Sequence, residues 1–146
     1  MSQRTPVFLD TNVALYLIGN DNPFRPSCAR LLRAAAEHAF PAFSDAEVIQ
    51  EIAYQTSGRG RRLAGLILAE KFMAAVGSIL PVTAEDMAEA LAILREYERL
   101  SPRDAVHLAV MRRHDITHIV TADRHFLAVP GITVLDPHAA AALLAD

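Results

Sequence analysis

The sequence has few of the features that mark a disulfide-stabilised, membrane-bound or secreted protein. It contains one cysteine, Cys28, which excludes an internal disulfide and a cysteine-rich zinc site. We expect this thiol to be buried as a small apolar group. No stretch approaches the roughly 18 uninterrupted apolar residues of a membrane span. The first apolar run (7–9) ends at Asp10, too early for the core of a signal peptide. We therefore expect a cytoplasmic protein.

Tryptophan is absent and Lys71 is the only lysine, so the other thirteen of the fourteen basic residues are arginine. Arginine suits bidentate recognition of phosphate, although an arginine-rich genome would give the same bias. The net charge of −3 does not by itself predict a nucleic-acid partner. Hydrophobic residues make up 52% and charged residues 21% of the chain, which excludes disorder. The length of 146 residues fits one domain, 1–146, whose core needs no crosslinks.

Short apolar runs alternate with helical patterns along the chain. The runs are continuous, as in strands covered on both faces, and comprise residues 7–9, 42–43, 79–82, 118–120 and 132–135. Helical patterns cover residues 26–38, 45–55, 61–76 and 137–144, and two further helices begin at Thr83 and at Ser101. The helix after Thr83 has a stripe that we expect to face the core: Met87, Ala90, Leu91, Leu94 and Tyr97. This alternation predicts an α/β domain with a mainly parallel sheet.

Acidic residues stand where this sheet would present its carboxyl edge. Asp10 follows the first strand, Asp123 follows the fourth, and Asp104 lies in the first turn of the helix between them. The helix after the second strand carries Glu47 and Glu51 on one face. Because the carboxyl ends of parallel strands meet at one edge, we expect these acids to lie close together. Each also has a structural interpretation, as a helix cap, a first-turn acid or exposed surface.

Clustered carboxylates repel one another and raise one another's pKa, so a cluster is stabilised by a bound cation. Oxygen ligands alone select Mg²⁺ or Mn²⁺ over Zn²⁺. Mg²⁺ is commonly held by a few carboxylates together with substrate phosphates. The pattern therefore indicates phosphoester chemistry.

Five segments carry a resemblance to a known family. They are VFLDTN at 7–12, QEI at 50–52, SPRDAVHLA at 101–109, IVTADRHF at 119–126 and VPGI at 129–132. In order and spacing they resemble the PIN-domain ribonucleases, and among these the VapC-like toxins of type II toxin–antitoxin systems. The resemblance covers almost the whole chain. It implies a PIN-like three-layer fold, with a five-stranded parallel sheet flanked by helices.

The resemblance also implies a metal-dependent endoribonuclease. Its acids would be Asp10, Glu51, Asp104 and Asp123, which bind Mg²⁺ or Mn²⁺ in the family. Asn12 and Thr121 match the polar positions beside the first and last acids. Glu47, one turn before Glu51, remains an alternative for the glutamate, and the family's fourth acid varies.

The resemblance further implies an RNA substrate, a VapB-like antitoxin as inhibitor and a homodimer. Arginines near the proposed site are candidate RNA contacts or ordinary surface: Arg59, Arg61, Arg62, Arg103 and Arg124. Two apolar sets can form an antitoxin groove or simply the core: Ala14, Leu15, Tyr16, Leu17 and Ile18, and Leu63, Leu66, Ile67, Phe72 and Met73.

Three histidines lie near the proposed acids or at the ends of predicted helices and need an interpretation. His107 follows Asp104 by three residues, as a candidate base or, as we expect, a structural or partly exposed histidine. We expect His114 and His125 at the surface.

Residues 9–12 superficially resemble the aspartate loop of dehalogenase-like phosphatases, but that family has a second aspartate where Asn12 stands. The non-enzymatic alternative is a catalytically silent PIN-like module that binds RNA or protein.

Overall fold

The computed structural model describes residues 1–2 and 4–145 as one parallel sheet covered by helices. The strands are β1 (Val7–Leu9), β2 (Ala42–Asp45), β3 (Ser78–Leu80), β4 (His118–Val120) and β5 (Thr133–Leu135). Their order across the sheet is β3-β2-β1-β4-β5, and every neighbouring pair is parallel. The predicted five-stranded parallel sheet is therefore confirmed.

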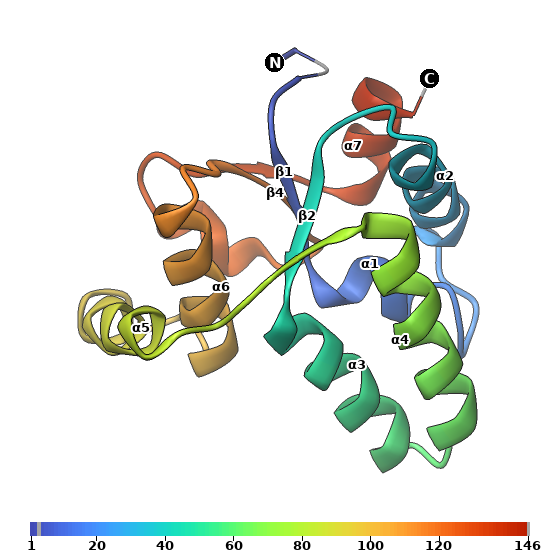
Figure 1. Cartoon of the computed structure of the whole chain (residues 1–146), viewed down its shortest axis with the longest axis horizontal. Helices are drawn as coiled ribbons and strands as arrows, with labels where there is room; N and C mark the ends of the chain where they lie inside the picture. The colour runs from blue at the N-terminus through green and yellow to red at the C-terminus, as the bar shows by residue number, and fades with distance from the viewer. Residues whose placement is uncertain (3, 146) are drawn as a thin grey trace.

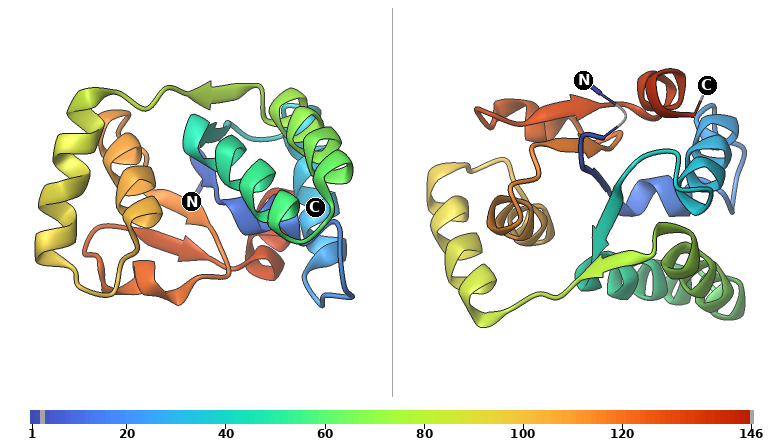
Figure 2. Two further views of the ribbon diagram at one scale, coloured as in Figure 1. Left: turned by 90° about the horizontal axis from the view of Figure 1, so that it is seen from below. Right: turned by 45° about the horizontal axis from the view of Figure 1, so that its top comes forward.

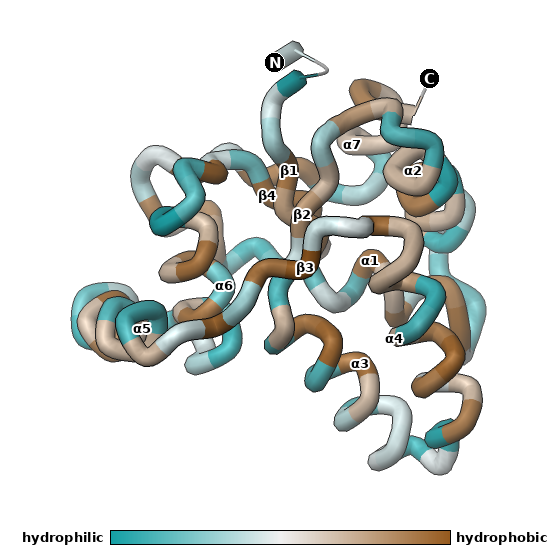
Figure 3. Tube along the Cα trace, in the orientation of Figure 1, coloured by the Kyte–Doolittle hydropathy of each residue, from teal (hydrophilic) through white to brown (hydrophobic). Residues whose placement is uncertain are grey.

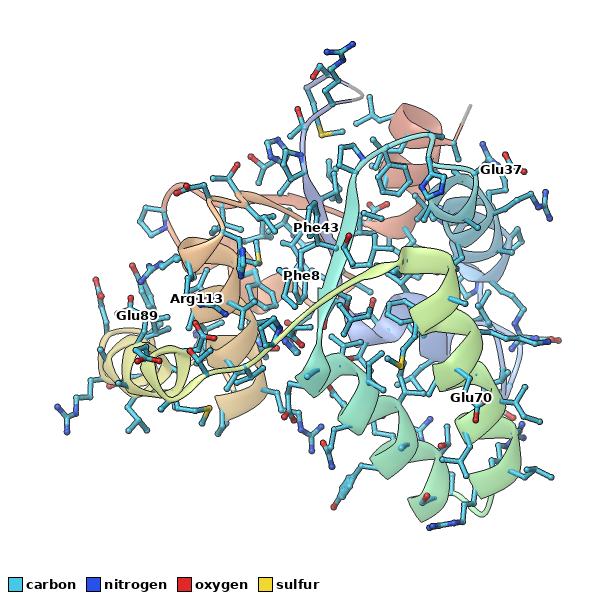
Figure 4. All side chains as sticks on the ribbon, viewed as in Figure 1. Phe8, Glu37, Phe43, Glu70, Glu89 and Arg113 are labelled. Atoms are coloured by element: carbon cyan, nitrogen blue, oxygen red, sulfur yellow. The ribbon has the colours of Figure 1, made fainter. Side chains whose placement is uncertain are left out.

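The first strand lies at the centre of the sheet, and its three residues are fully buried. Val7 pairs with Ala42 on one side and with His118 on the other. Figure 3 shows hydrophobic colouring on β1 and β4, and Figure 4 shows Phe8 and Phe43 on neighbouring strands. Beyond the end of β1, the Asp10 backbone N–H donates to the carbonyl oxygen of Val120 at 3.1 Å. This bond places Asp10 beside the segment that follows β4.

Helices cover both faces of the sheet. They are α1 (Thr11–Leu15), α2 (Arg25–Ala36), α3 (Ala46–Gly58), α4 (Arg62–Val76), α5 (Ala84–Glu96), α6 (Pro102–Arg113) and α7 (Pro137–Leu144), with a 3-10 helix, η1 (Arg124–Ala128). In Figure 1 and Figure 2, α5 and α6 lie on one side of the strands, and α2, α4 and α7 lie on the other. The chain reverses direction across the sheet after β3, so right-handed crossovers put the helices on opposite faces. None of the described helices has the length and apolarity needed to cross a bilayer.

The predicted bounds hold for β1, β4 and α7, and differ by a few residues elsewhere. The third strand ends at Leu80 rather than at Val82. Pro81 explains the difference because it has no backbone N–H to donate to a neighbouring strand. Cys28 is buried as predicted, and burial raises the pKa of its thiol to about 12.

The predicted core face of α5 is right in part. Ala90 is buried, and Leu94 and Tyr97 pack against the core. Met87 and Leu91 are 45% and 60% exposed, whereas Ile93 is buried. The helix is rotated because Asp86 turns inward, where it is 2% exposed and receives two hydrogen bonds from Arg113 of α6, at 2.8 and 2.9 Å. The Arg113 side chain reaches toward α5 in Figure 4. These bonds lower the pKa of Asp86 to about 2 against the opposing effect of burial.

The start of α6 is fixed by a capping box, as its sequence predicts. The Ser101 hydroxyl accepts from the Asp104 backbone N–H at 3.2 Å, and the Asp104 carboxylate accepts from the Ser101 N–H at 3.3 Å. Thr83 and Asp86 form the same arrangement at the start of α5. The box holds the Asp104 carboxylate at the first turn, next to the carboxyl edge of the sheet.

The α3 and α4 helices pack closely where Gly65 faces Thr56. The Thr56 side chain is 3% exposed, and its hydroxyl donates to the Ile52 carbonyl oxygen at 2.8 Å. A β-carbon at position 65 would overlap the side-chain atoms of Thr56. Because α3 carries Glu51, this contact also sets the orientation of one side of the candidate site.

Candidate active site

A cleft of about 400 Å³ opens at the carboxyl ends of the strands. Its lining includes the four predicted acids, Asp10, Glu51, Asp104 and Asp123, together with Asn12 and Arg59. The acids come from the loop after β1, the middle of α3, the first turn of α6 and the loop after β4. The fold thus brings together carboxylates that are far apart in the sequence. Glu47 is half-buried one turn before Glu51 and is not among the described residues that line the cleft.

Asp10 is the least solvent-exposed of the four acids that line the cleft. Its side chain caps α1 by accepting from the Thr11 backbone N–H at 2.8 Å, and its second oxygen accepts from the Thr121 hydroxyl at 2.7 Å. The residue is 6% exposed. Burial raises the pKa of Asp10 despite the nearby His107 and these hydrogen bonds. The carboxylate is therefore held rigidly, in an environment that favours a neutralising partner.

Asn12 and Thr121 connect the ends of β1 and β4. The Asn12 side-chain amide donates to the Thr121 hydroxyl at 3.0 Å, and the Asp123 backbone N–H donates to the same hydroxyl at 3.0 Å. The Asn12 side-chain carbonyl oxygen accepts from the Ala122 backbone N–H at 3.3 Å. These side chains bond within the protein, so their position supports a role in holding Asp10 and Asp123 rather than in contacting a substrate.

Glu51 is a firmly held anion on α3. It accepts from the Thr11 hydroxyl at 2.6 Å, from Arg103 at 2.9 Å and from Gln55 at 2.9 Å. Burial opposes ionisation, but His107, Thr11 and Arg103 outweigh it and lower the pKa of Glu51 to about 2. Arg103 also lies over the Tyr54 ring, 5.4 Å from its centroid. The structure therefore places Arg103 in an ion pair with the site glutamate, where sequence reasoning considered it for RNA.

Asp104 and Asp123 both line the cleft and lie near each other. Burial and the charges of Asp10 and Asp123 raise the pKa of Asp104 to about 6. Asp123 caps η1 through a hydrogen bond from the His125 N–H at 2.8 Å, as one interpretation of the sequence predicts. Ligand atoms of Asp104, Asp123 and His125 lie within 4.8 Å of one another. Mutually repelling oxygens of this kind, beside open space, fit a hard divalent cation. His125 is exposed, as predicted, yet belongs to this group.

His107 lies beneath the acids and is fully buried. Its Nδ1 is 2.7 Å from a carboxylate oxygen of Asp45, and its Nε2 is 3.8 Å from oxygens of both Asp10 and Glu51. Burial lowers the pKa of His107, but these carboxylates outweigh it and raise the pKa well above its usual value. His107 is thus a fully buried histidine bonded to Asp45, and not a partly exposed one. His114 is half-buried rather than at the surface.

Asp45 and Thr11 were missed as members of this site. Asp45 was interpreted only as the start of a helix, and it does cap α3 by accepting from the Val48 N–H at 2.9 Å. The signal for its second role was its place at the carboxyl end of a strand, since Asp45 is the last residue of β2. Thr11 adjoins Asp10 and carried no comparable signal.

The proposed RNA-binding arginines differ in position. Arg59, Arg61 and Arg62 are exposed at the turn between α3 and α4. Arg59 lines the cleft, and Arg61 lines a smaller hollow beside it. Arg124 is exposed next to Asp123. The basic turn therefore borders the acidic cleft.

Comparison with known proteins agrees with this architecture. The PIN domain family model matches residues 7–132, which include strands β1 to β4 and all four acids. The chain belongs to the PIN-domain family.

Its similarity is to the VapC members of that family. Ribonuclease VapC13 of Mycobacterium tuberculosis is 36% identical over 126 residues, covering 86% of this chain and 96% of that protein. Ribonuclease VapC23 of the same species is 36% identical over 124 residues, covering 84% and 95%. The structure is also similar to that of M. tuberculosis VapC20, a sarcin–ricin loop cleaving toxin, with a TM-score of 0.70, 24% identity and coverage of 85% and 95%. VapBC2 of Rickettsia felis, bound to a promoter DNA fragment, gives a TM-score of 0.70 at 17% identity, covering 90% and 98%.

Proposed function

We propose that this chain is a metal-dependent endoribonuclease and the toxin of a toxin–antitoxin pair. The observation that carries the proposal is the convergence of four carboxylates from separate segments on one open cleft, in a chain similar to VapC ribonucleases. Membership of the PIN-domain family argues against the phosphatase alternative. The presence of all four acids in the cleft argues against a silent binding module. We propose that residues 1–146 act as one domain, in the cytoplasm, where its RNA substrate lies.

The proposed ligands of Mg²⁺ or Mn²⁺ are Asp10, Glu51, Asp104 and Asp123. Their oxygens match the preference of these ions. A bound ion would supply a water of lowered pKa and neutralise charge that develops on the scissile phosphate. The raised pKa of Asp104 and of Asp10 supports a role for a cation in keeping both ionised.

The residues around these acids hold and orient them. Thr121 keeps one oxygen of Asp10 fixed from β4, and Thr11 fixes Glu51 from the start of α1. Arg103 neutralises part of the Glu51 charge without closing the cleft. Arg59 at the rim provides positive charge for the RNA backbone as it enters.

The first test is an RNA-cleavage assay with purified protein in Mg²⁺, in Mn²⁺ and in EDTA. We expect cleavage with either ion, loss of cleavage in EDTA and recovery when excess Mg²⁺ is added. Undiminished cleavage in EDTA would contradict the metal-dependent mechanism. A folded, antitoxin-free protein that cuts nothing in a broad RNA panel would favour the silent binding module.

The basic turn gives a separate prediction about RNA affinity. Changing Arg59, Arg61 and Arg62 together to Gln should weaken binding at low salt and flatten its dependence on salt. If the three contact three phosphates, the slope of log K against log salt should fall by about 2, since each single-strand phosphate contributes about 0.7. Binding of a noncleaved RNA analogue, measured by fluorescence anisotropy over a salt series, checks this result.

A matched control removes the same charge elsewhere. Arg4, Arg95 and Arg99 are exposed and are not among the described residues that line the cleft. Their change to Gln should leave the slope almost unchanged. Equal slopes for the two triple variants would place the RNA on another surface.

We also propose a VapB-like antitoxin as the inhibiting partner. The α4 helix exposes Leu63, Leu66, Ile67 and Met73, the first by 73%. Leu15 and Ile18 line the neighbouring cleft, so a partner chain seated on this apolar surface would reach the acids. Phe72, which was grouped with these residues, belongs to the core instead. The proposed homodimer rests on the family resemblance.

A further inference from the structure

The buried pair formed by Asp45 and His107 has no part in the chemistry proposed above. It lies directly under the cleft, where both side chains are completely shielded from solvent. Asp45 comes from the end of β2 and His107 from the second turn of α6. The pair therefore joins two elements that also carry, or lead into, the proposed metal ligands.

The hydrogen-bond pattern defines how the ring is held. One Asp45 oxygen accepts from the Val48 N–H at 2.9 Å, and the other faces His107 Nδ1 at 2.7 Å. Because a carboxylate only accepts, Nδ1 is the donor in this bond. The Phe8 ring packs against the imidazole with centroids 5.4 Å apart. The imidazole is thus fixed at one edge and confined at its face.

The opposite edge of the ring faces the acids. His107 Nε2 is buried and has no hydrogen-bond partner among the described residues. It is 3.8 Å from an oxygen of Asp10 and 3.8 Å from an oxygen of Glu51. An Nε2 lone pair aimed at two carboxylates would be repelled by both, whereas an N–H is attracted to both. One ring edge therefore faces both the end of β1 and the middle of α3.

We propose that His107 is a positioning residue that uses its Nε2–H to hold Asp10 and Glu51 in the arrangement that binds metal. Asp45 sets the ring orientation, and His107 relates the two carboxylates to each other. This inference rests on the proposed function, since it concerns the same metal site. It assigns no contact between His107 and the RNA or the metal.

Two substitutions with amide side chains test the two edges of the ring separately. In His107→Asn the side-chain amide lies near the place of Nδ1, so the bond to Asp45 is kept and the Nε2 edge is lost. In His107→Gln the amide lies near the place of Nε2, so the edge that faces the acids is kept. Both variants are neutral and similar in size, which makes each the control for the other.

The measurement is Mn²⁺ affinity, from the free-ion signal in electron paramagnetic resonance, with folding checked by circular dichroism and thermal melting. We expect His107→Asn to weaken Mn²⁺ binding by about tenfold or more, as is typical for loss of a group that orients a metal ligand. We expect His107→Gln to remain within about threefold of wild type. RNA cleavage at saturating Mn²⁺ should follow the same order.

Each other result overturns the inference. Equal affinities in both variants and wild type would show that the ring does not arrange the ligands. Better binding by His107→Asn than by His107→Gln would show that the bond to Asp45 alone matters, which is a purely structural role. If one variant fails to fold, Asp45→Asn tests the same link, and unchanged Mn²⁺ affinity there would also overturn it. A wild-type protein without Mn²⁺ affinity would instead overturn the proposed function and this inference together.

Discussion

Asp10→Asn and Asp104→Asn are each expected to reduce RNA cleavage by at least about a thousandfold without unfolding the protein. A proposed metal ligand contributes several kcal/mol of charge stabilisation in the transition state, and each 1.36 kcal/mol corresponds to a tenfold change in rate. The asparagine side chain keeps the size of aspartate and one of its acceptor oxygens. Because burial raises the pKa of both carboxyls, a neutral amide removes an unfavourable buried charge at either position. At Asp10 this gain offsets the loss of one of two acceptor oxygens. The metal-free variants should therefore melt close to the wild-type temperature.

Two measurements are made on each variant and on wild type: the initial rate of RNA cleavage at saturating Mg²⁺, and a melting curve in EDTA. Glu98→Gln is the matched control, because it removes one carboxylate from an exposed turn that does not line the cleft. This control should cut RNA at the wild-type rate. Near-normal cleavage by Asp10→Asn would refute the mechanism, whereas low activity together with a large drop in melting temperature would indicate a folding defect.

Gly65→Ala is expected to destabilise the protein strongly although it adds a single methyl group. The new β-carbon would overlap three side-chain atoms of Thr56. Thr56 has little freedom to move because it is buried and its hydroxyl is bonded to the Ile52 carbonyl oxygen. The α3 and α4 helices must separate, and overpacking of this kind costs about 3 kcal/mol. For a chain of this size that corresponds to a fall in melting temperature of roughly 10 °C.

Thermal and urea unfolding of the variant check this prediction. Gly58→Ala is the control, since it adds the same methyl group to a helical glycine with no atom within 4 Å. It should be neutral or slightly stabilising. The double variant Thr56→Gly with Gly65→Ala should recover more stability than the two separate effects predict, because the overlap is removed. Additive losses would show that the two residues do not contact each other as described.

The main features of the fold could be predicted from the sequence because they depend on local patterns. The buried runs at Val7–Leu9 and His118–Val120 are short and continuous, which is typical of central parallel strands. The rule that such strands end at one edge then predicts that Asp10 and Asp123 are neighbours. Ser101 and Asp104 have the spacing of a capping box, and the structure contains one.

The contacts that could not be predicted join residues far apart in the chain. His107 and Asp45 are 62 positions apart, and Thr11 and Glu51 are 40 apart. Neither pair has a spacing that a local pattern can reveal. The exposure of Met87 and Leu91 on α5 was missed for a related reason: nothing in their stripe shows that Asp86 is buried by its bonds to Arg113, 27 positions away. A polar residue with a distant partner can thus override an apolar stripe.

The central position of β1 has a consequence for the order in which the molecule is made. The first strand to leave the ribosome pairs with β2 and with β4, and Thr121, the partner of Asp10, lies 111 residues further along the chain. Asp123 follows Asp10 by 113 residues and is the last of the four acids to be synthesised. A nascent chain therefore has no complete acidic cleft, and fragments left by premature termination lack it altogether. The proposed nuclease can therefore attack RNA only after the segment that carries Thr121 and Asp123 has been made.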